Sequence, residues 1–354
     1  MHLTPLAIPA ITTLRSSMRN HSSIPAPARP VARSLPRAGL LLSSLMALAL
    51  VACGGSDDDD TSSPPLTVPA SNTLTTDLVL PGFNSAIDIY QPAGATRALV
   101  LLHGGLGSKN QIAYNFGVRL DAELPNASNV NWAWLQANKV IVVTPQGQAI
   151  DEAKVATTWS NGAMVSGQDD MAFLKTLASH LRSTYGITEL YLMGHSMGAV
   201  MTNRVWCQAS ESYTGYAAFA GPASRLYTGS TCAPASQRPY YGIAGEQDNV
   251  LQVTGNWSAA TWTVNPLLTS GPAFTDPVLL GEWAQFVARS QRLCSETPRL
   301  DAGSVSGTVE SWSSCNSHLR VQHDLAVDHD LGMPEANHGT RLLDAAIGFL
   351  DSAR

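Results

Sequence analysis

The sequence predicts an α/β fold in which helices cover both faces of a mostly parallel central sheet. Short, uninterrupted apolar runs at residues 98–102 and 140–143 are typical of strands that are buried on both faces. Between such runs, residues 170–185 place apolar side chains at helical spacing and are followed by Gly186, a residue type that commonly ends helices. This alternation of strands with helices indicates a mostly parallel sheet.

The remaining elements continue the alternation. The run at residues 319–327 alternates apolar and polar side chains, which favours a strand nearer the sheet edge. Residues 73–354 are predicted to form one folded domain, in which the irregular, Trp-containing segment 252–277 is expected to form a flap. The other expected elements are strands at residues 190–193, 216–220 and 240–244, a helix that begins at Met197, and a closing amphipathic helix over residues 341–350.

Residues 1–52 are predicted to be a signal peptide of the lipoprotein type. Three arginines precede an uncharged apolar run, residues 38–52, that is too short to span a bilayer comfortably as a helix. The small residues before Cys53 resemble a bacterial lipobox, which implies lipidation of Cys53 and an exported cell-envelope lipoprotein anchored in the membrane. The absence of Asp at position 54 implies sorting to the outer membrane. A plain secretory signal and a transmembrane anchor are the alternatives. Because the segment before the apolar run is unusually long, Met18 is a candidate for the true start of the chain.

Residues 53–72 are predicted to be a disordered acidic tether. Four consecutive aspartates at residues 57–60 are surrounded by Gly, Ser, Thr and Pro. Such a stretch cannot bury apolar surface and stays solvated. It would let the folded domain stand off a membrane surface.

The cysteine count predicts two disulfide bonds. Once Cys53 is set aside, an even number of cysteines remains, which is typical of disulfides in an exported chain. Sequence proximity favours the pairs Cys207–Cys232 and Cys294–Cys315, although three connectivities are possible. Free thiols are the alternative, and a metal site is not expected because no two cysteines have C-x-x-C spacing.

Composition argues against nucleic acid as a partner. Charged residues make up 14% of the chain and hydrophobic residues 44%, which is ordinary for a globular protein with a large core. The formal net charge is −6, which includes the four tether aspartates, and no basic patch is present. No cofactor or metal ion is predicted.

The pentapeptide at residues 194–198 matches G-x-S-x-G, with Ser196 at its centre. It stands between a predicted strand and a predicted helix, which is the context of a nucleophile elbow. A serine hydroxyl is a weak nucleophile, so it has to be exposed at a tight turn where a base can reach it, and the two glycines permit that turn. The alternative is a glycine-rich turn with an incidental serine.

A second glycine-rich stretch, residues 103–107, directly follows the strand at 98–102. Ligands of parallel sheets bind at the carboxyl ends of the strands, so this loop and the elbow lie at the same edge. The backbone N–H groups of Gly105 and Met197 are therefore predicted to form an oxyanion hole. His103 is expected to be a packed or hydrogen-bonded loop residue. The phosphate-loop alternative lacks the G-x-x-x-x-G-K pattern.

The catalytic acid is expected after a strand beyond the elbow. Asp248 follows the strand at 240–244 and is the favoured candidate; Glu246 is the alternate, and a solvated turn acid is the other interpretation. Asp169 and Asp170 precede the elbow and are expected to cap a helix N-terminus.

Two histidines are candidates for the base. His329 lies just beyond the last predicted strand and is favoured, whereas His338 stands just before the closing helix. His318 and His323 are expected to be structural. His195, inside the elbow, is expected to point away from the side of attack.

The chain resembles the α/β-hydrolases, and among them the secreted polyhydroxybutyrate depolymerase and feruloyl esterase-like group. The family's Gly-x-Gly-His before the base is replaced here by residues 326–329, so His338 remains an alternative to His329. No separate polymer-binding domain is present. The resemblance covers residues 98–354 and rests on residues 103–105, Trp159, the pair Asp169 and Asp170, residues 191–198, Asp248, Cys294 and Cys315.

The resemblance implies that residues 73–354 are an α/β-hydrolase catalytic domain. The chain is thus expected to be a serine-dependent carboxylic ester hydrolase that acts on a small-molecule or oligomeric ester through a Ser-His-Asp triad and an acyl-enzyme. A peptidase or acyltransferase on the same fold is one alternative. A non-catalytic binding protein of the cell envelope is the other.

Overall fold

The computed structural model describes residues 70–150, 157–162, 164–221, 232, 234–248, 250, 282–333 and 338–354. The chain divides into two units, residues 1–61 and 62–354, and every described residue belongs to the second. The predicted signal peptide, Cys53 with most of the tether, and the predicted flap lie outside the described residues. Within the described ranges, no helix is both long and apolar enough to cross a bilayer.

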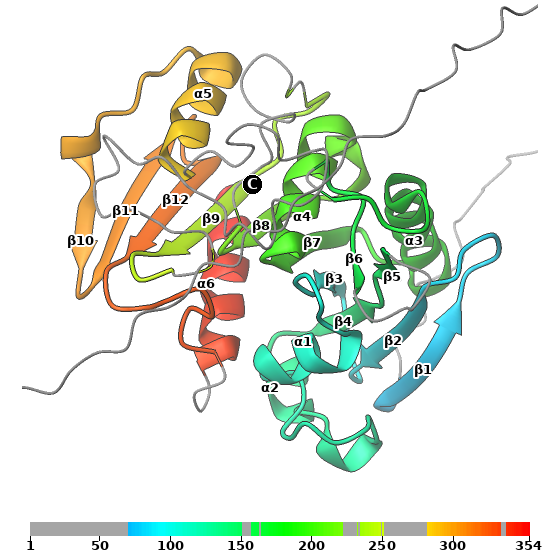
Figure 1. Cartoon of the computed structure of the whole chain (residues 1–354). Helices are drawn as coiled ribbons and strands as arrows, with labels where there is room; N and C mark the ends of the chain where they lie inside the picture. Colours follow the sequence, from blue (N-terminus) through cyan, green and yellow to red (C-terminus); the bar gives the residue numbers. More distant parts are fainter. Residues whose placement is uncertain are drawn as a thin grey trace, which may run out of the picture. The chain divides into compact units, whose positions relative to one another are not determined.

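A ten-stranded sheet forms the centre of this domain, in the order β1-β2-β4-β3-β7-β8-β9-β12-β11-β10 (Figure 1). The six central strands, from β4 to β12, run parallel to one another. The pairs at both edges are antiparallel. The strands are β1 (Thr73–Val79), β2 (Ala86–Gln91), β3 (Arg97–Leu102), β4 (Val140–Pro145), β7 (Glu189–His195), β8 (Gly215–Phe219), β9 (Tyr240–Gly245), β10 (Ser304–Ser306), β11 (Val309–Ser314) and β12 (Leu319–Asp324).

Helices cover both faces of the sheet, which confirms the predicted fold class. The core on one face is built with α3, α4 and α5, and the core on the other face with α1, α2 and α6. These helices are α1 (Lys109–Asn115), α2 (Trp132–Ala137), α3 (Asp170–Tyr185), α4 (Met197–Gln208), α5 (Glu282–Cys294) and α6 (His338–Ser352). Because β3 and β4 are covered on both faces, most of their side chains are apolar in both directions, as the uninterrupted runs at residues 98–102 and 140–143 indicated.

The last predicted strand is shorter and more central than expected. β12 ends at Asp324 rather than at residue 327, and it lies between β9 and β11. The edge is formed instead by β11 and β10, whose polar sequences gave no strand pattern. A small separate sheet pairs β5 (Gln148–Ala149) with β6 (Thr157–Thr158).

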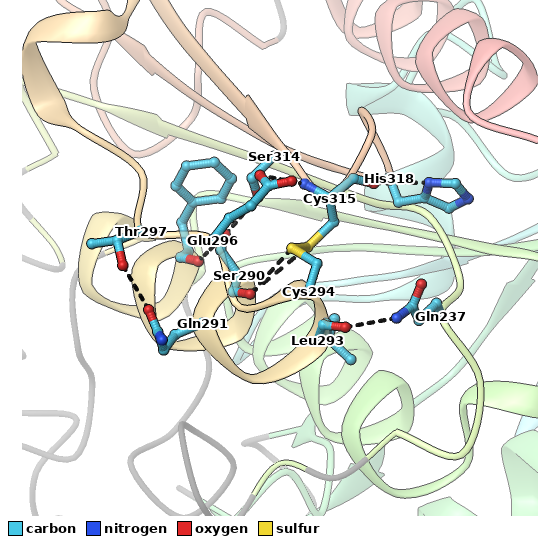
Figure 2. The surroundings of a disulfide bond; sticks show 11 residues. Gln237, Ser290, Gln291, Leu293, Cys294, Glu296, Thr297, Ser314, Cys315 and His318 are labelled. Carbon is cyan, nitrogen blue, oxygen red and sulfur yellow. Dashed lines mark hydrogen bonds between the residues drawn. A yellow bond between two sulfur atoms is a disulfide. The ribbon is translucent and has the colours of Figure 1, made fainter.

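Two disulfide bonds pair the cysteines by sequence proximity. Cys207 bonds to Cys232, and Cys294 bonds to Cys315. Figure 2 shows the second bridge, which joins the end of α5 to the turn between β11 and β12. Close to it, the hydroxyls of Ser290 and Ser314 lie 2.5 Å apart. The bridge therefore fastens a covering helix to the antiparallel edge of the sheet.

Candidate active site

Ser196 lies at a sharp turn between β7 and α4. Its φ of 54° and ψ of −121° place a non-glycine residue in a region that side chains rarely adopt. The glycines on either side make the turn possible. A Cβ on Gly194 would lie 2.4 Å from backbone atoms of Gly198, and a Cβ on Gly198 would lie 2.4 Å from the carbonyl oxygen of Leu102. The elbow therefore tolerates no side chain at either glycine.

A continuous chain of hydrogen bonds joins Ser196, His329 and Asp248. Nε2 of His329 lies 2.9 Å from Oγ of Ser196, and Nδ1 of His329 lies 2.7 Å from Oδ2 of Asp248. A carboxylate can only accept, so Nδ1 of neutral His329 carries the proton and Nε2 presents a lone pair to the serine hydroxyl. This arrangement can take a proton from Oγ.

Asp248 follows β9 in a tight turn. The N–H of Val250 donates to its Oδ1 at 2.9 Å, which leaves Oδ2 facing His329. The loop that carries His329 packs directly against this strand, because a Cβ on Gly245 would lie 2.4 Å from the carbonyl oxygen of Val327. Glu246, the alternate acid, has its Oε2 2.6 Å from Nε2 of His323 instead.

The other histidines occupy different places. His318 bonds to the carbonyl of Cys315 in the β11–β12 turn, and His323 is buried in β12. His338 is the first residue of α6, and its side chain lies outside the described part of the chain.

The expectation that His195 points away from the side of attack is wrong. Its Nε2 lies 2.9 Å from the carbonyl oxygen of His329, and the two rings are 5.0 Å apart. A carbonyl accepts, so Nε2 of His195 must carry the proton. Burial, with a smaller effect of His329, lowers the pKa of His195 to about 3. A neutral His195 thus supports the His329 loop.

Gly105 lies in the glycine loop beside Ser196, and Met197 directly follows the serine as the first residue of α4. Within the described residues, neither N–H has a hydrogen-bond acceptor. A Cβ on Gly104 would lie 3.1 Å from Cβ of Ser196, and one on Gly105 would lie 3.2 Å from Cγ of Met197, so the glycine loop lies directly over the elbow. Two unpaired donors beside a serine hydroxyl can stabilise an oxyanion.

His103 fixes the orientation of the glycine loop. The N–H of Gly147 donates to its Nε2 at 2.8 Å, so the proton is on Nδ1, which donates to the carbonyl of Gly104 at 2.7 Å. Because a trans peptide is planar, the Gly105 N–H points opposite to that carbonyl, away from the imidazole ring. Burial lowers the pKa of His103 to about 4, which keeps the ring neutral.

A cavity of about 150 Å³ opens beside Ser196. Its walls include the glycine loop, His195 and His329, and the polar side chains of Gln111, Asn115 and Asp330 also line it. Among the described residues, no group of His, Cys, Asp or Glu is arranged to hold a metal ion.

Only one of the two adjacent aspartates at the start of α3 caps the helix. Asp169 accepts from the N–H of Ala172, as expected. Asp170 is fully buried and accepts instead from the N–H of Ser160 and the hydroxyl of Ser166, each at 2.6 Å. Burial raises the pKa of Asp170, and these hydrogen bonds partly offset the effect.

Comparisons with known proteins found only distant likenesses among solved structures. No family model and no curated protein matches the chain. Among solved structures, the chain is similar to an acetyl xylan esterase from Aspergillus awamori, with 13% identity, a TM-score of 0.48, and coverage of 79% of this chain and 99% of that one. It is also similar to an S-formylglutathione hydrolase from Agrobacterium tumefaciens, with 9% identity, a TM-score of 0.46, and coverage of 80% and 95%. Such distant likenesses carry no argument about activity.

The order of strands, the helices on both faces and the elbow between β7 and α4 define the α/β-hydrolase fold. In this fold the nucleophile is followed in the chain by the acid and then by the base. Ser196, Asp248 and His329 have that order.

Proposed function

We propose that the protein is a serine-dependent carboxylic ester hydrolase. Ser196 is the nucleophile, His329 the general base, Asp248 the acid that orients the base, and the N–H groups of Gly105 and Met197 form the oxyanion hole. The observation that supports this most is the hydrogen-bond chain from Oγ of Ser196 through His329 to Oδ2 of Asp248, at 2.9 and 2.7 Å.

The reaction follows from this geometry. Nε2 of His329 takes the proton from Oγ of Ser196 as the oxygen attacks the ester carbonyl carbon, and the two N–H groups stabilise the negative charge on the carbonyl oxygen. Asp248 stabilises the imidazolium. His329 then gives its proton to the departing alcohol, which leaves an acyl group on Ser196. A water molecule, activated by the same imidazole, hydrolyses this acyl-enzyme and restores the serine.

Within this class we propose a relationship to the polyhydroxybutyrate depolymerase and feruloyl esterase-like group. The proposal rests on the motifs in the sequence, namely residues 103–105 and 191–198 with Asp248 and the Cys294–Cys315 pair. We propose a small-molecule or oligomeric ester as the substrate.

We also propose that the enzyme is exported and held at the cell envelope by lipid on Cys53. Two disulfide bonds are compatible with an oxidising compartment. In cells, a Cys53→Ser variant should lose incorporation of a fatty-acid label and move from the membrane to the soluble fraction. Unchanged labelling would contradict the anchor at Cys53.

The test of the activity is a Ser196→Ala variant assayed with p-nitrophenyl esters of short acyl chains. Removal of the nucleophile should reduce turnover by at least about 10⁴-fold, as for other residues of such triads, while the circular dichroism spectrum and the unfolding midpoint stay close to those of the wild type. Undiminished turnover would contradict the proposal. Hydrolysis of amides alone, or acyl transfer to alcohols instead of water, would favour a peptidase or an acyltransferase.

A further inference from the structure

A short buried segment links the two sides of the proposed oxyanion hole. Nε1 of Trp159 donates to the carbonyl oxygen of His103 at 2.8 Å, and the two rings lie 5.1 Å apart. Two residues later, Nδ2 of Asn161 donates to the carbonyl oxygen of Met197 at 3.1 Å. Trp159 and Asn161 are both completely buried. One tripeptide therefore contacts both segments that carry the proposed N–H donors.

Hydrogen bonds also fix residues 159–161 to the helices α3 and α4. Between the two buried side chains, the N–H of Ser160 donates to Oδ2 of Asp170 at the start of α3, and its carbonyl accepts from Arg204 of α4. Oδ1 of Asn161 accepts from the N–H of Met164 at 2.8 Å. The segment is thus fixed to α3 and α4, two long helices that cover the sheet. The strand β6 directly before it is bonded to the glycine loop, because the N–H of Leu106 donates to the carbonyl oxygen of Thr157 at 2.8 Å.

The tripeptide at residues 159–161 contacts the two residues that determine where the proposed N–H donors lie, His103 and Met197. His103 directs the Gly105 N–H through its bond to the Gly104 carbonyl, so a shift of the His103 backbone moves that donor. Met197 supplies the second donor itself. An oxyanion hole needs both N–H groups about 2.7–3.1 Å from one developing charge, so the separation of the two segments has to be held closely.

We propose that Trp159 and Asn161 are positioning residues that hold the Gly105 and Met197 N–H groups at the separation an oxyanion requires. They act through the carbonyls of His103 and Met197 and do not contact the substrate. This assignment rests on the proposed ester hydrolase function. Its alternative is that both side chains only fill the core.

Trp206 provides a matched control for Trp159. It is also completely buried, and its Nε1 donates to a backbone carbonyl, that of Arg238, at 3.0 Å. Trp159→Phe and Trp206→Phe therefore each remove one indole N–H bond and a similar volume from the same core. Only the first removes a bond to the glycine loop.

The experiment compares kcat, KM and the unfolding midpoint of these two variants in the full chain. Because a displacement of about 1 Å in a site costs up to about 100-fold in rate, Trp159→Phe should lower kcat by about 10- to 100-fold with KM nearly unchanged. The same variant should bind a trifluoromethyl ketone inhibitor, which forms an oxyanion adduct with the serine, more weakly by a similar factor. Trp206→Phe should lower the unfolding midpoint about as much as Trp159→Phe does, but its kcat should equal that of the wild type.

Asn161→Leu, which removes the amide at nearly constant size, should reproduce the loss of kcat. Its control is Asn129→Leu, since Asn129 is also buried but donates to Leu124 and Asp121, away from the cavity. Equal kcat values for Trp159→Phe and Trp206→Phe, beside an inactive Ser196→Ala, would overturn the positioning role alone. Full activity of Ser196→Ala would overturn the proposed function, and this assignment with it.

Discussion

At the scale of single residues, the backbone at Ser196 is held in a conformation that costs free energy. Its positive φ is imposed by the close approach of β7, α4 and the end of β3, which meet at Gly194 and Gly198. Strain of this kind, on the order of 1–3 kcal/mol, persists only where the surrounding structure enforces it, and it is concentrated at functional sites. The result is that Oγ reaches Nε2 of His329 from the tip of the turn.

Gly198→Ala tests this requirement. A Cβ there would lie 2.4 Å from the Leu102 carbonyl oxygen, so β3 and α4 would have to separate, and both esterase activity and the unfolding midpoint should fall sharply.

The matched control is Gly348→Ala, in the middle of α6. A Cβ at Gly348 meets nothing within 4 Å, so this variant should be as active as the wild type and more stable by about 0.5–1 kcal/mol. A Gly198→Ala variant with normal activity would contradict the geometry of the elbow.

At the scale of elements, the site is assembled from loops at the carboxyl ends of parallel strands. β3, β7 and β9 each lead directly into a part of it: the glycine loop, the elbow and the Asp248 turn. His329 lies in the loop that follows β12, and β12 pairs in parallel with β9. Parallel pairing brings these ends together although the residues are far apart in the chain.

The Cys294–Cys315 bridge lies before β12, at the opposite end of the strand from the loop that carries His329. We expect a Cys294→Ala/Cys315→Ala double variant to lose about 3 kcal/mol of unfolding free energy, as expected for a closed loop of about 20 residues. Below its unfolding transition it should keep the kcat of the wild type. Denaturant titration and kinetics at one temperature measure both quantities, and a large loss of kcat in the folded variant would show that the bridge also supports the site.

At the scale of the whole molecule, buried neutral histidines couple stability to pH. Burial lowers the pKa of His103 to about 4, of His195 to about 3 and of His323 to about 4. In the unfolded chain a histidine has a pKa of about 6.5, so below that pH the unfolded state binds protons that the folded state excludes. The stability from these groups is complete above about pH 6.5 and is lost as the pH falls toward their folded pKa values.

The unfolding midpoint should therefore decrease as the pH is lowered from about 7 to about 5. His323→Gln should make this decrease shallower, because the unfolded variant then binds one proton fewer than the unfolded wild type at low pH. His323 contacts Glu246 and lies outside the proposed catalytic groups, so activity at neutral pH provides a check that the fold is kept. A slope identical to that of the wild type would contradict the contribution of this histidine.

Much of this molecule follows from local sequence patterns, and the remainder depends on tertiary contacts. Strands such as β3 and β4 were predictable because burial on both faces makes them almost entirely apolar. In contrast, β1, β10 and β11 contain many exposed or partly exposed residues, so their sequences resemble those of loops. Ser196 was predictable because the elbow is a local motif. The roles of His195 and Asn161 were not, since their partners, His329 and Met197, lie 134 and 36 positions away.

The most direct test of the central claim is labelling of the full-length protein with a fluorophosphonate probe, with the adduct mapped by mass spectrometry. If His329 activates Ser196, the label should be found on Ser196, and it should form much more slowly in His329→Ala while His338→Ala labels like the wild type. Absence of labelling, labelling of a different serine, or loss of labelling only in His338→Ala would contradict the account.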